Sequence, residues 1–211
     1  MPMDIILPLV KESISKLDHS VESSTDAAKS LMTTDTYHKE FAVETTVNGE
    51  KVTIGGITKG VGMIAPNMGT MLCFLATDAV ISSEMINKAL KSSVNKSFNM
   101  IVVDGDQSTN DTAILMANGK SGVEVAENNE INEDFQEALD FICISLAKMM
   151  ARDGEGATKF IECKVNGAKT EEDAILASKS VISSSLVKSA IFGGDPNWGR
   201  IVAAVGYSGC K

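Results

Sequence analysis

A threonine stands where a glycine-rich segment meets a hydrophobic run. Residues 55–70 read GGITKGVGMIAPNMGT, and the apolar residues 71–75 follow directly. A backbone break before Thr70 would place an α-amine beside its hydroxyl, and that amine can accept the hydroxyl proton. Gly69 lacks a Cβ, so the preceding peptide can bend for self-attack. The pattern makes Thr70 a candidate nucleophile, although spacing alone favours an ordinary threonine at the start of a strand.

Three cofactor motifs are incomplete in this sequence. Residues 60–65 match a loose dinucleotide fingerprint, but Pro66 interrupts the helix that such a motif must open. Val61 stands where a phosphate-binding loop requires lysine. Residues 104–115 resemble a calcium loop, yet Leu115 replaces its bidentate glutamate, so a turn capping a following helix is the better interpretation. We expect no cofactor and no metal.

Composition narrows the class of protein further. The formal net charge is −9 over 211 residues, without a cluster of basic residues, which argues against nucleic-acid binding. No run of 18 apolar residues and no signal peptide is apparent, so we expect a cytoplasmic protein that does not enter a membrane. The four cysteines are scattered and predict buried, reduced thiols, and His19 and His38 predict surface residues.

Hydrophobic periodicity and turn residues predict the elements that would position Thr70. Alternation over 41–54 around Asn48-Gly49 predicts a β-hairpin. Helices are expected over 5–17, from Ser82 or Ser83 to 94, over 135–150 and over 170–188, strands over 71–75, 100–103 and 160–165, and a polar loop to about residue 25. One hairpin without regular βαβ alternation predicts an α+β fold of layered helices and sheet. Its central sheet would carry Thr70 near a strand start, under helices from Ser83, Phe135 and Thr170.

Longer motifs carry a resemblance to a known family. Residues 59–72, KGVGMIAPNMGTML, resemble the self-cleavage motif of the ornithine acetyltransferase family. Four further segments resemble family segments in the same order, namely residues 32–36, 104–111, 152–159 and 195–200. The resemblance therefore extends over essentially the whole chain.

The resemblance implies an enzyme of arginine biosynthesis that moves an acetyl group from N-acetylornithine to glutamate. It implies cleavage between Gly69 and Thr70, giving an α chain that ends at residue 69 and a β chain that starts at residue 70, assembled as an α2β2 heterotetramer. Thr70 would be the nucleophile and would also contact substrate. Lys59 and Glu155 match substrate-binding positions, and a lysine and a glutamate suit a zwitterionic amino acid.

A third substrate-binding position falls in the segment 32–36. We assign it to Thr33, with Thr36 in the same segment as the alternative.

The chain also departs from the family pattern. Val61 replaces a usual serine and Gly69 a usual alanine. The family's chain starts before Met1 and continues past Lys211, so the Thr-Gly pair of its oxyanion hole and a C-terminal substrate-binding asparagine are missing. Loss of oxyanion donors costs about 10²- to 10³-fold each in rate. We therefore expect a piece of a longer protein or a natural truncation that is a poor enzyme alone, with an inactive assembly or regulatory remnant as the alternative function.

Overall fold

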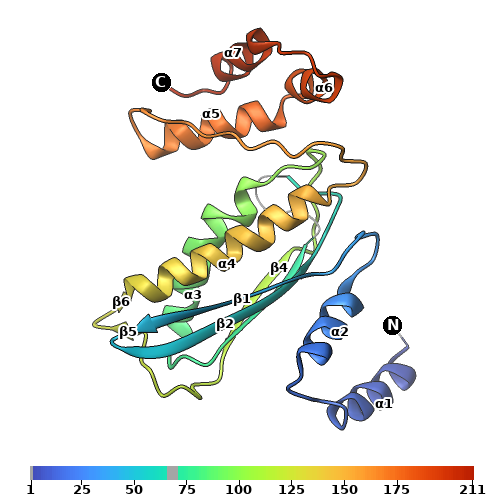
Figure 1. Ribbon diagram of the computed structural model, residues 1–211, viewed down its shortest axis with the longest axis vertical. Coiled ribbons are helices and arrows are strands. Elements are labelled where there is room, and N and C mark those ends of the chain that lie inside the picture. Colours follow the sequence, from blue (N-terminus) through green and yellow to red (C-terminus); the bar gives the residue numbers. More distant parts are fainter. Residues whose placement is uncertain (1, 66–70) are drawn as a thin grey trace.

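A four-stranded sheet forms the centre of the protein (Figure 1), which we describe from a computed structural model over residues 2–65 and 71–211. Its strands lie in chain order, and they are β1 (Lys39–Val47), β2 (Glu50–Lys59), β3 (Leu72–Thr77) and β4 (Thr112–Ala117). β2 is antiparallel to both of its neighbours, β1 and β3, whereas β3 and β4 are parallel. The expected α+β class is confirmed.

The β1–β2 hairpin forms where the alternating pattern predicted it. Val47 pairs with Glu50, which leaves a two-residue turn. Both turn residues have positive φ, +53° at Asn48 and +88° at Gly49. This backbone shape matches the right-handed twist of the flanking strands, and asparagine followed by glycine adopts it at low cost.

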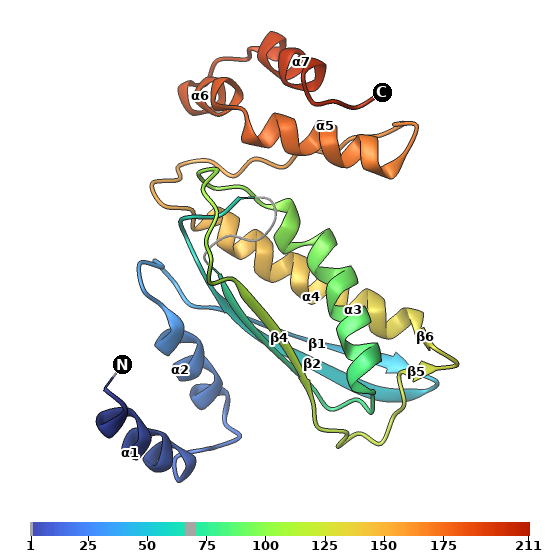
Figure 2. The ribbon, with the colours of Figure 1, turned by 180° about the vertical axis from the view of Figure 1, so that it is seen from behind.

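Two helices pack side by side on one face of the sheet, α3 (Ser83–Lys96) and α4 (Glu133–Arg152) (Figures 1 and 2). Ser82 and Asn132 cap their N-termini, since each side chain accepts a backbone N–H of the first turn. The apolar stripe of α4 fills the space above β1 and β2. Its buried residues are Phe135, Ala138, Leu139, Ile142, Cys143, Leu146, Ala147 and Met150. Both helices expected from periodicity are confirmed.

The N-terminal region holds two helices, α1 (Met3–Ile14) and α2 (Val21–Leu31). The polar loop expected up to about residue 25 is wrong. Ser20 accepts the Ser23 N–H and starts α2, and α2 packs on the sheet face opposite α4 (Figure 2). The sequence of α2 is mostly polar, but a helix needs only one narrow apolar face to pack against a sheet, and the contact with β1 and β2 supplies that packing.

Two expected strands are absent from the described residues. Residues 98–100 form a short 3₁₀ helix, η1 (Phe98–Met100), and residues 101–103 continue as irregular chain. Residues 160–165 run as irregular chain too. Both segments contain strand-forming residues, but a strand also needs a neighbour to complete its hydrogen-bond ladder.

The region after residue 103 differs from expectation as well. No helix follows the turn at 104–110; β4 begins at Thr112 instead and takes the place beside β3. A small hairpin then joins β5 (Ala126–Glu127) to β6 (Glu130–Ile131) before α4.

The C-terminal region folds as three short helices, α5 (Glu171–Ser183), α6 (Ser185–Gly193) and α7 (Trp198–Gly206). The single helix expected over 170–188 is wrong, because Ser184 leaves the helical conformation and caps α6 by accepting the Val187 N–H. The three helices pack on one another, so α5 does not cover the sheet as expected (Figure 1). α7 was not predicted.

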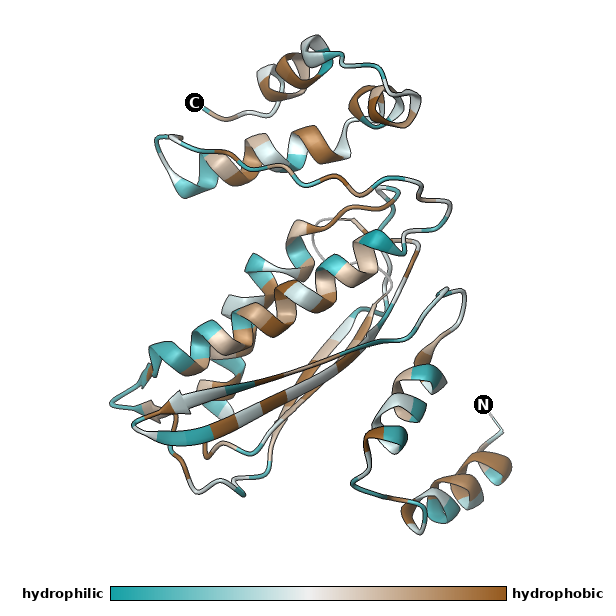
Figure 3. Cartoon of the chain, in the orientation of Figure 1, coloured by the Kyte–Doolittle hydropathy of each residue, from teal (hydrophilic) through white to brown (hydrophobic). Residues whose placement is uncertain are grey.

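Apolar residues lie on the surface of the terminal helices (Figure 3). α1 buries no residue, and the side chains of Trp198 and Val202 on α7 are 74% and 59% exposed. Within the described residues, no single helix meets the length and apolarity needed to cross a membrane, while α5 and α6 pass that test only as a pair bent by 57°.

Candidate active site

The end of β2 lies beside the start of β3 where these two inner strands reach one end of the sheet, and this end is called the β2–β3 edge. Lys59, the last residue of β2, pairs directly with Leu72, the first residue of β3. Thr70 and Gly69 lie outside the described residues. In the sequence only one residue, Met71, separates Thr70 from Leu72, and the nucleophilic role of Thr70 stays a prediction.

Lys59 reaches toward the segment before β1. Its Nζ donates to the Thr33 hydroxyl at 3.5 Å. The Thr36 hydroxyl instead donates to Asp153, and the Thr36 N–H donates to the same carboxylate at 3.0 Å. The structure therefore brings Thr33 and Lys59 together, whereas Thr36 is held by another partner. The substrate-binding role of both threonines stays a prediction.

A buried charge cluster lies directly beneath this edge. The Lys39 ammonium, with no exposed side-chain surface, contacts Asp35 Oδ1 and Asp153 Oδ2, each at 2.6 Å. Asp35 also accepts the Gly60 N–H at 2.9 Å and the Thr33 N–H at 3.2 Å. The cluster thereby ties together the segment before β1, the end of β2 and the end of α4.

The cluster favours ionised carboxylates. Burial acts to raise the pKa of Asp35 and Asp153, but hydrogen bonds from Lys39 and from backbone N–H groups outweigh it, so both pKa values lie below the ordinary aspartate value. Sequence reasoning missed this cluster, because Lys39 and Asp153 stand 114 residues apart. The one local signal was the spacing of Asp35 and Lys39.

Glu155 comes into the site just after α4. Its N–H donates to the Val61 carbonyl at 2.7 Å, which holds the glycine-rich loop against the end of α4. A Cβ built on Gly62 would lie 2.7 Å from Glu155 Oε2. The absence of a side chain at Gly62 thus leaves room for the carboxylate.

Asp104 fixes the other side of the same loop. Its carboxylate accepts the N–H groups of Met63 at 2.6 Å and Ile64 at 3.1 Å. The Val103 N–H in turn donates to the Ile64 carbonyl at 2.8 Å. The sequence indicated only a turn at Asp104, and this anchoring role was not predicted.

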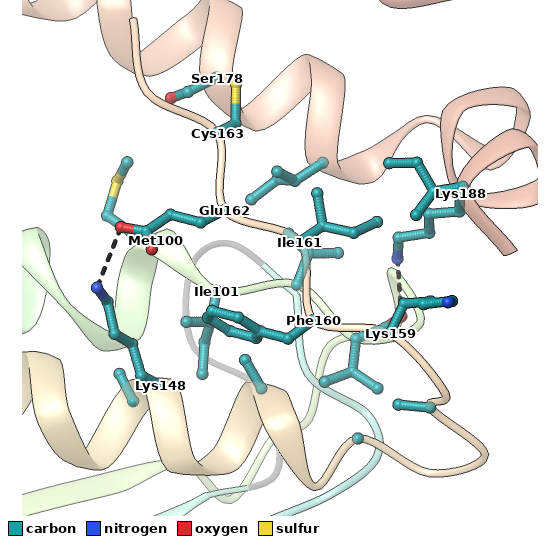
Figure 4. A pocket seen from close by; sticks show the side chains of 18 of the residues that line it. Met100, Ile101, Lys148, Lys159, Phe160, Ile161, Glu162, Cys163, Ser178 and Lys188 are labelled. Atoms are coloured by element: carbon teal, nitrogen blue, oxygen red, sulfur yellow. Dashed lines mark hydrogen bonds and ion pairs between the residues drawn. The ribbon is translucent and has the colours of Figure 1, made fainter. Parts of the chain in front are cut away.

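Two cavities adjoin Glu155. The smaller, about 400 Å³, lies between residues 34–37 and 152–157. The larger, about 580 Å³, lies between α4 and α5–α6 and has mostly apolar walls (Figure 4). At its rim Lys148 pairs with Glu162 at 3.1 Å, and Lys188 donates to the Val103 carbonyl at 2.8 Å.

Other candidate groups lie away from this edge or are unreactive. Cys73 and Cys143 are buried, and burial raises the pKa of the Cys143 thiol to about 12. His19 is exposed, and His38 lies 3.5 Å from Glu40. Across residues 2–65 and 71–211, no three histidine, cysteine or acidic side chains gather as metal ligands.

The fold and the site together define an α+β protein whose candidate substrate residues converge at the end of β2. The sequence profile of the ArgJ family matches residues 1–211, and the chain therefore belongs to the ArgJ family. This confirms the resemblance drawn from the motifs.

Named relatives agree with that membership. A glutamate N-acetyltransferase of Methanocaldococcus jannaschii is 57% identical over 95% of this chain and 50% of its own length. The arginine biosynthesis bifunctional protein ArgJ of Caldanaerobacter subterraneus is 51% identical over 99% of this chain and 52% of its own length. The chain thus spans about half the length of the curated relatives it matches.

A solved structure is similar as well. The arginine biosynthesis bifunctional protein argJ from Bacillus halodurans superposes with a TM-score of 0.63 at 47% identity, covering 65% of each chain.

Proposed function

We propose that this chain forms part of a cytoplasmic glutamate N-acetyltransferase that transfers an acetyl group from N-acetylornithine to glutamate. The observation that carries the proposal is the contact of Lys59 with Thr33 where β2 ends beside Leu72, with Glu155 bonded to Val61 two residues further along. The relatives named glutamate N-acetyltransferase support the choice of reaction.

The residues of the site suit an amino-acid substrate. The Lys59 ammonium would pair with a substrate carboxylate, with the Thr33 hydroxyl beside it, and the Glu155 carboxylate would pair with a substrate amine. Asp35 of the buried charge cluster bonds the N–H groups of Thr33 and of Gly60, the residue after Lys59. Lys59 and Thr33, 3.5 Å apart, therefore need little reorganisation when the substrate binds.

The chemistry would begin with self-cleavage. The Thr70 hydroxyl attacks the Gly69 carbonyl carbon, and the Gly69–Thr70 C–N bond breaks to leave an ester and the free α-amine of Thr70. Water then opens the ester to give the Gly69 carboxylate and the Thr70 hydroxyl, with the α-amine available as a base. The Thr70 hydroxyl would then take the acetyl group from N-acetylornithine as an ester, with ornithine leaving as the free amine. The α-amine of glutamate would attack this ester, which forms N-acetylglutamate and restores the Thr70 hydroxyl. Residues 1–69 and 70–211 would become the α-chain and β-chain portions of an α2β2 heterotetramer.

Mass spectrometry of the protein incubated with N-acetylornithine tests the route. We expect an added acetyl group on the peptide that begins with Thr70. Lys59→Met should raise the KM for N-acetylornithine at least 10-fold, because a neutral side chain cannot pair with a carboxylate. Lys51→Met is the matched control, since Lys51 lies in the same strand and pairs with Glu44 away from the site.

Turnover without acetyl on Thr70 would contradict the route. A chain that neither cleaves nor turns over, even when it is combined with the parts of its relatives that it does not span, would favour the inactive remnant instead.

A further inference from the structure

Val103 contacts two separate parts of the candidate site. Its N–H donates to the Ile64 carbonyl at 2.8 Å, in the loop of residues 60–65. Its side chain packs on Gly154, where a built Cβ would lie 3.1 Å from Val103 Cγ1. Gly154 directly precedes Glu155 in the chain. The position of Val103 therefore affects both the loop and the segment that carries Glu155.

The backbone of Val103 depends on a side chain from the C-terminal region. Residues 101–103 are irregular chain, so no strand ladder satisfies the Val103 carbonyl. Lys188 of α6 supplies the partner, because its Nζ donates to this carbonyl at 2.8 Å (Figure 4). A hydrogen bond from a charged donor is stronger than one between neutral groups. A residue 85 positions further along the chain thus holds Val103 in place.

The charge of Lys188 also favours the anchor of the loop. Lys188 is half-buried, and burial lowers its pKa, whereas the nearby Asp104 carboxylate acts in the opposite direction. The same carboxylate accepts the N–H groups of Met63 and Ile64. Removing a lysine from water is costly. Its contacts here offset that cost at the two residues that fix the loop, Val103 and Asp104.

We propose that Lys188 is a positioning residue of the candidate site. From α6 it fixes Val103, and through Val103 it fixes the loop of residues 60–65 and the start of the segment that carries Glu155. The assignment rests on the proposed function for its effect on substrate, whereas its effect on the loop can be measured in the chain without substrate.

Hydrogen exchange of single backbone amides, followed by NMR on the full chain, tests the effect on the loop. Lys188→Met removes the charged donor but keeps an apolar stem. We expect the amides of Met63, Ile64 and Val103 to exchange about 10-fold faster, as for loss of one hydrogen bond from a charged group. Lys188→Arg keeps a charged donor and should restore slow exchange.

Two controls separate this coupling from a loss of packing in α6. The Gly60 amide should exchange as in wild type, because its partner Asp35 belongs to the buried charge cluster. Lys179→Met should leave the loop unchanged, because Lys179 is a half-buried lysine on α5 whose pKa is lowered by burial alone. Faster exchange confined to α5–α7 in Lys188→Met would overturn the proposal.

The wild-type chain provides a second measurement if Lys188→Met does not fold. Amide exchange is measured at rising urea concentrations below the unfolding transition. We expect the loop amides of Met63 and Ile64 to lose protection at the same urea concentration as the amides of α6. Loss of protection at a different concentration would overturn the proposal.

Kinetics test the effect on substrate. Lys188→Met should raise the KM for N-acetylornithine at least about 5-fold and change kcat less, because a displaced Glu155 pairs less well with the substrate amine. Lys188→Arg should restore the KM. An unchanged KM in Lys188→Met would overturn the role in substrate positioning. A wild-type chain without turnover would refute the proposed function, while the exchange rates would still decide whether Lys188 fixes the loop.

Discussion

Lys39 is the residue on which the candidate site depends most. Lys39 contacts none of the candidate substrate-binding residues that the structure describes. Its partner Asp35 accepts the N–H groups of Thr33 and Gly60, and its partner Asp153 lies at the end of α4. Removing one partner of a buried ion pair leaves an uncompensated charge, which costs far more than the pair contributed.

Lys39→Met should therefore lower the free energy of unfolding by about 3–5 kcal/mol. Lys16→Met is the control, because Lys16 makes an equally short ion pair of 2.6 Å with Glu12 but is 70% exposed. We expect it to leave the free energy of unfolding unchanged. Urea denaturation of both variants measures the difference, and equal effects would show that burial does not govern the energetics of the cluster.

The same cluster makes stability depend on pH in the acid range. Asp35 and Asp153 have folded pKa values below the unfolded value of about 3.9, so the unfolded state binds more protons. Their contribution should be complete above the unfolded pKa and disappear as pH falls through the folded pKa values. Denaturation midpoints between pH 2 and 6 should show this decline in wild type. A double variant with asparagine at both positions should have a flatter profile, and an identical slope would contradict the assignment.

At the scale of elements, the approach of α4 to β2 is set by a glycine. A Cβ on Gly56 would lie 2.5 Å from Leu75 Cδ2 and 3.0 Å from Leu146 Cδ1, both in the core. Its neighbour Gly55 points to the opposite face, where no atom lies within 4 Å of a built Cβ. The two glycines therefore have different reasons to lack a side chain.

Gly56→Ala should lower the free energy of unfolding by about 1–3 kcal/mol, because the buried leucines must move to admit the methyl group. Gly55→Ala should be neutral or should stabilise slightly through the unfolded chain. Thermal denaturation compares the two variants. A Gly55→Ala variant that loses as much stability as Gly56→Ala would show that backbone effects, and not packing against α4, are responsible.

At the scale of the whole molecule, the sheet with α3 and α4 has a continuous core, whereas α5–α7 share a separate small one. Large exposed apolar surfaces usually mark contacts with another protein surface. The apolar surface of α7 includes Trp198, the only tryptophan of the sequence.

Tryptophan fluorescence should report what covers α7. At low concentration the emission of Trp198 should be that of an indole in water, since 74% of the residue is exposed. Self-association at higher concentration should bury Trp198 and shift its emission to shorter wavelength. Val202→Asp should prevent this shift, because a charge on α7 beside Trp198 opposes burial of the surface. Leu17→Asp is the control, because Leu17 is also an exposed aliphatic residue, 81% exposed, but lies beyond the end of α1. A shift that Leu17→Asp abolishes and Val202→Asp leaves intact would contradict the assignment to α7.

The sequence by itself determined the features whose causes are local. Asn48-Gly49 specified the hairpin, the stripe from Phe135 to Met150 specified α4, and the motif of residues 59–72 indicated the family that the comparisons confirmed. Turn conformation, helical periodicity and motif order all act over a few residues, so they can be read without the fold.

Tertiary structure decided what depends on distant partners. Residues 101–103 and 160–165 have strand-forming side chains but gain no neighbouring strand within the described chain. Lys39 meets Asp153 only because β1 lies beneath α4. The ionisation of such a cluster, like the pairing of a strand, depends on groups that lie far apart in the chain and meet only in the folded protein. The interaction energies between these groups therefore arise only when the fold has formed.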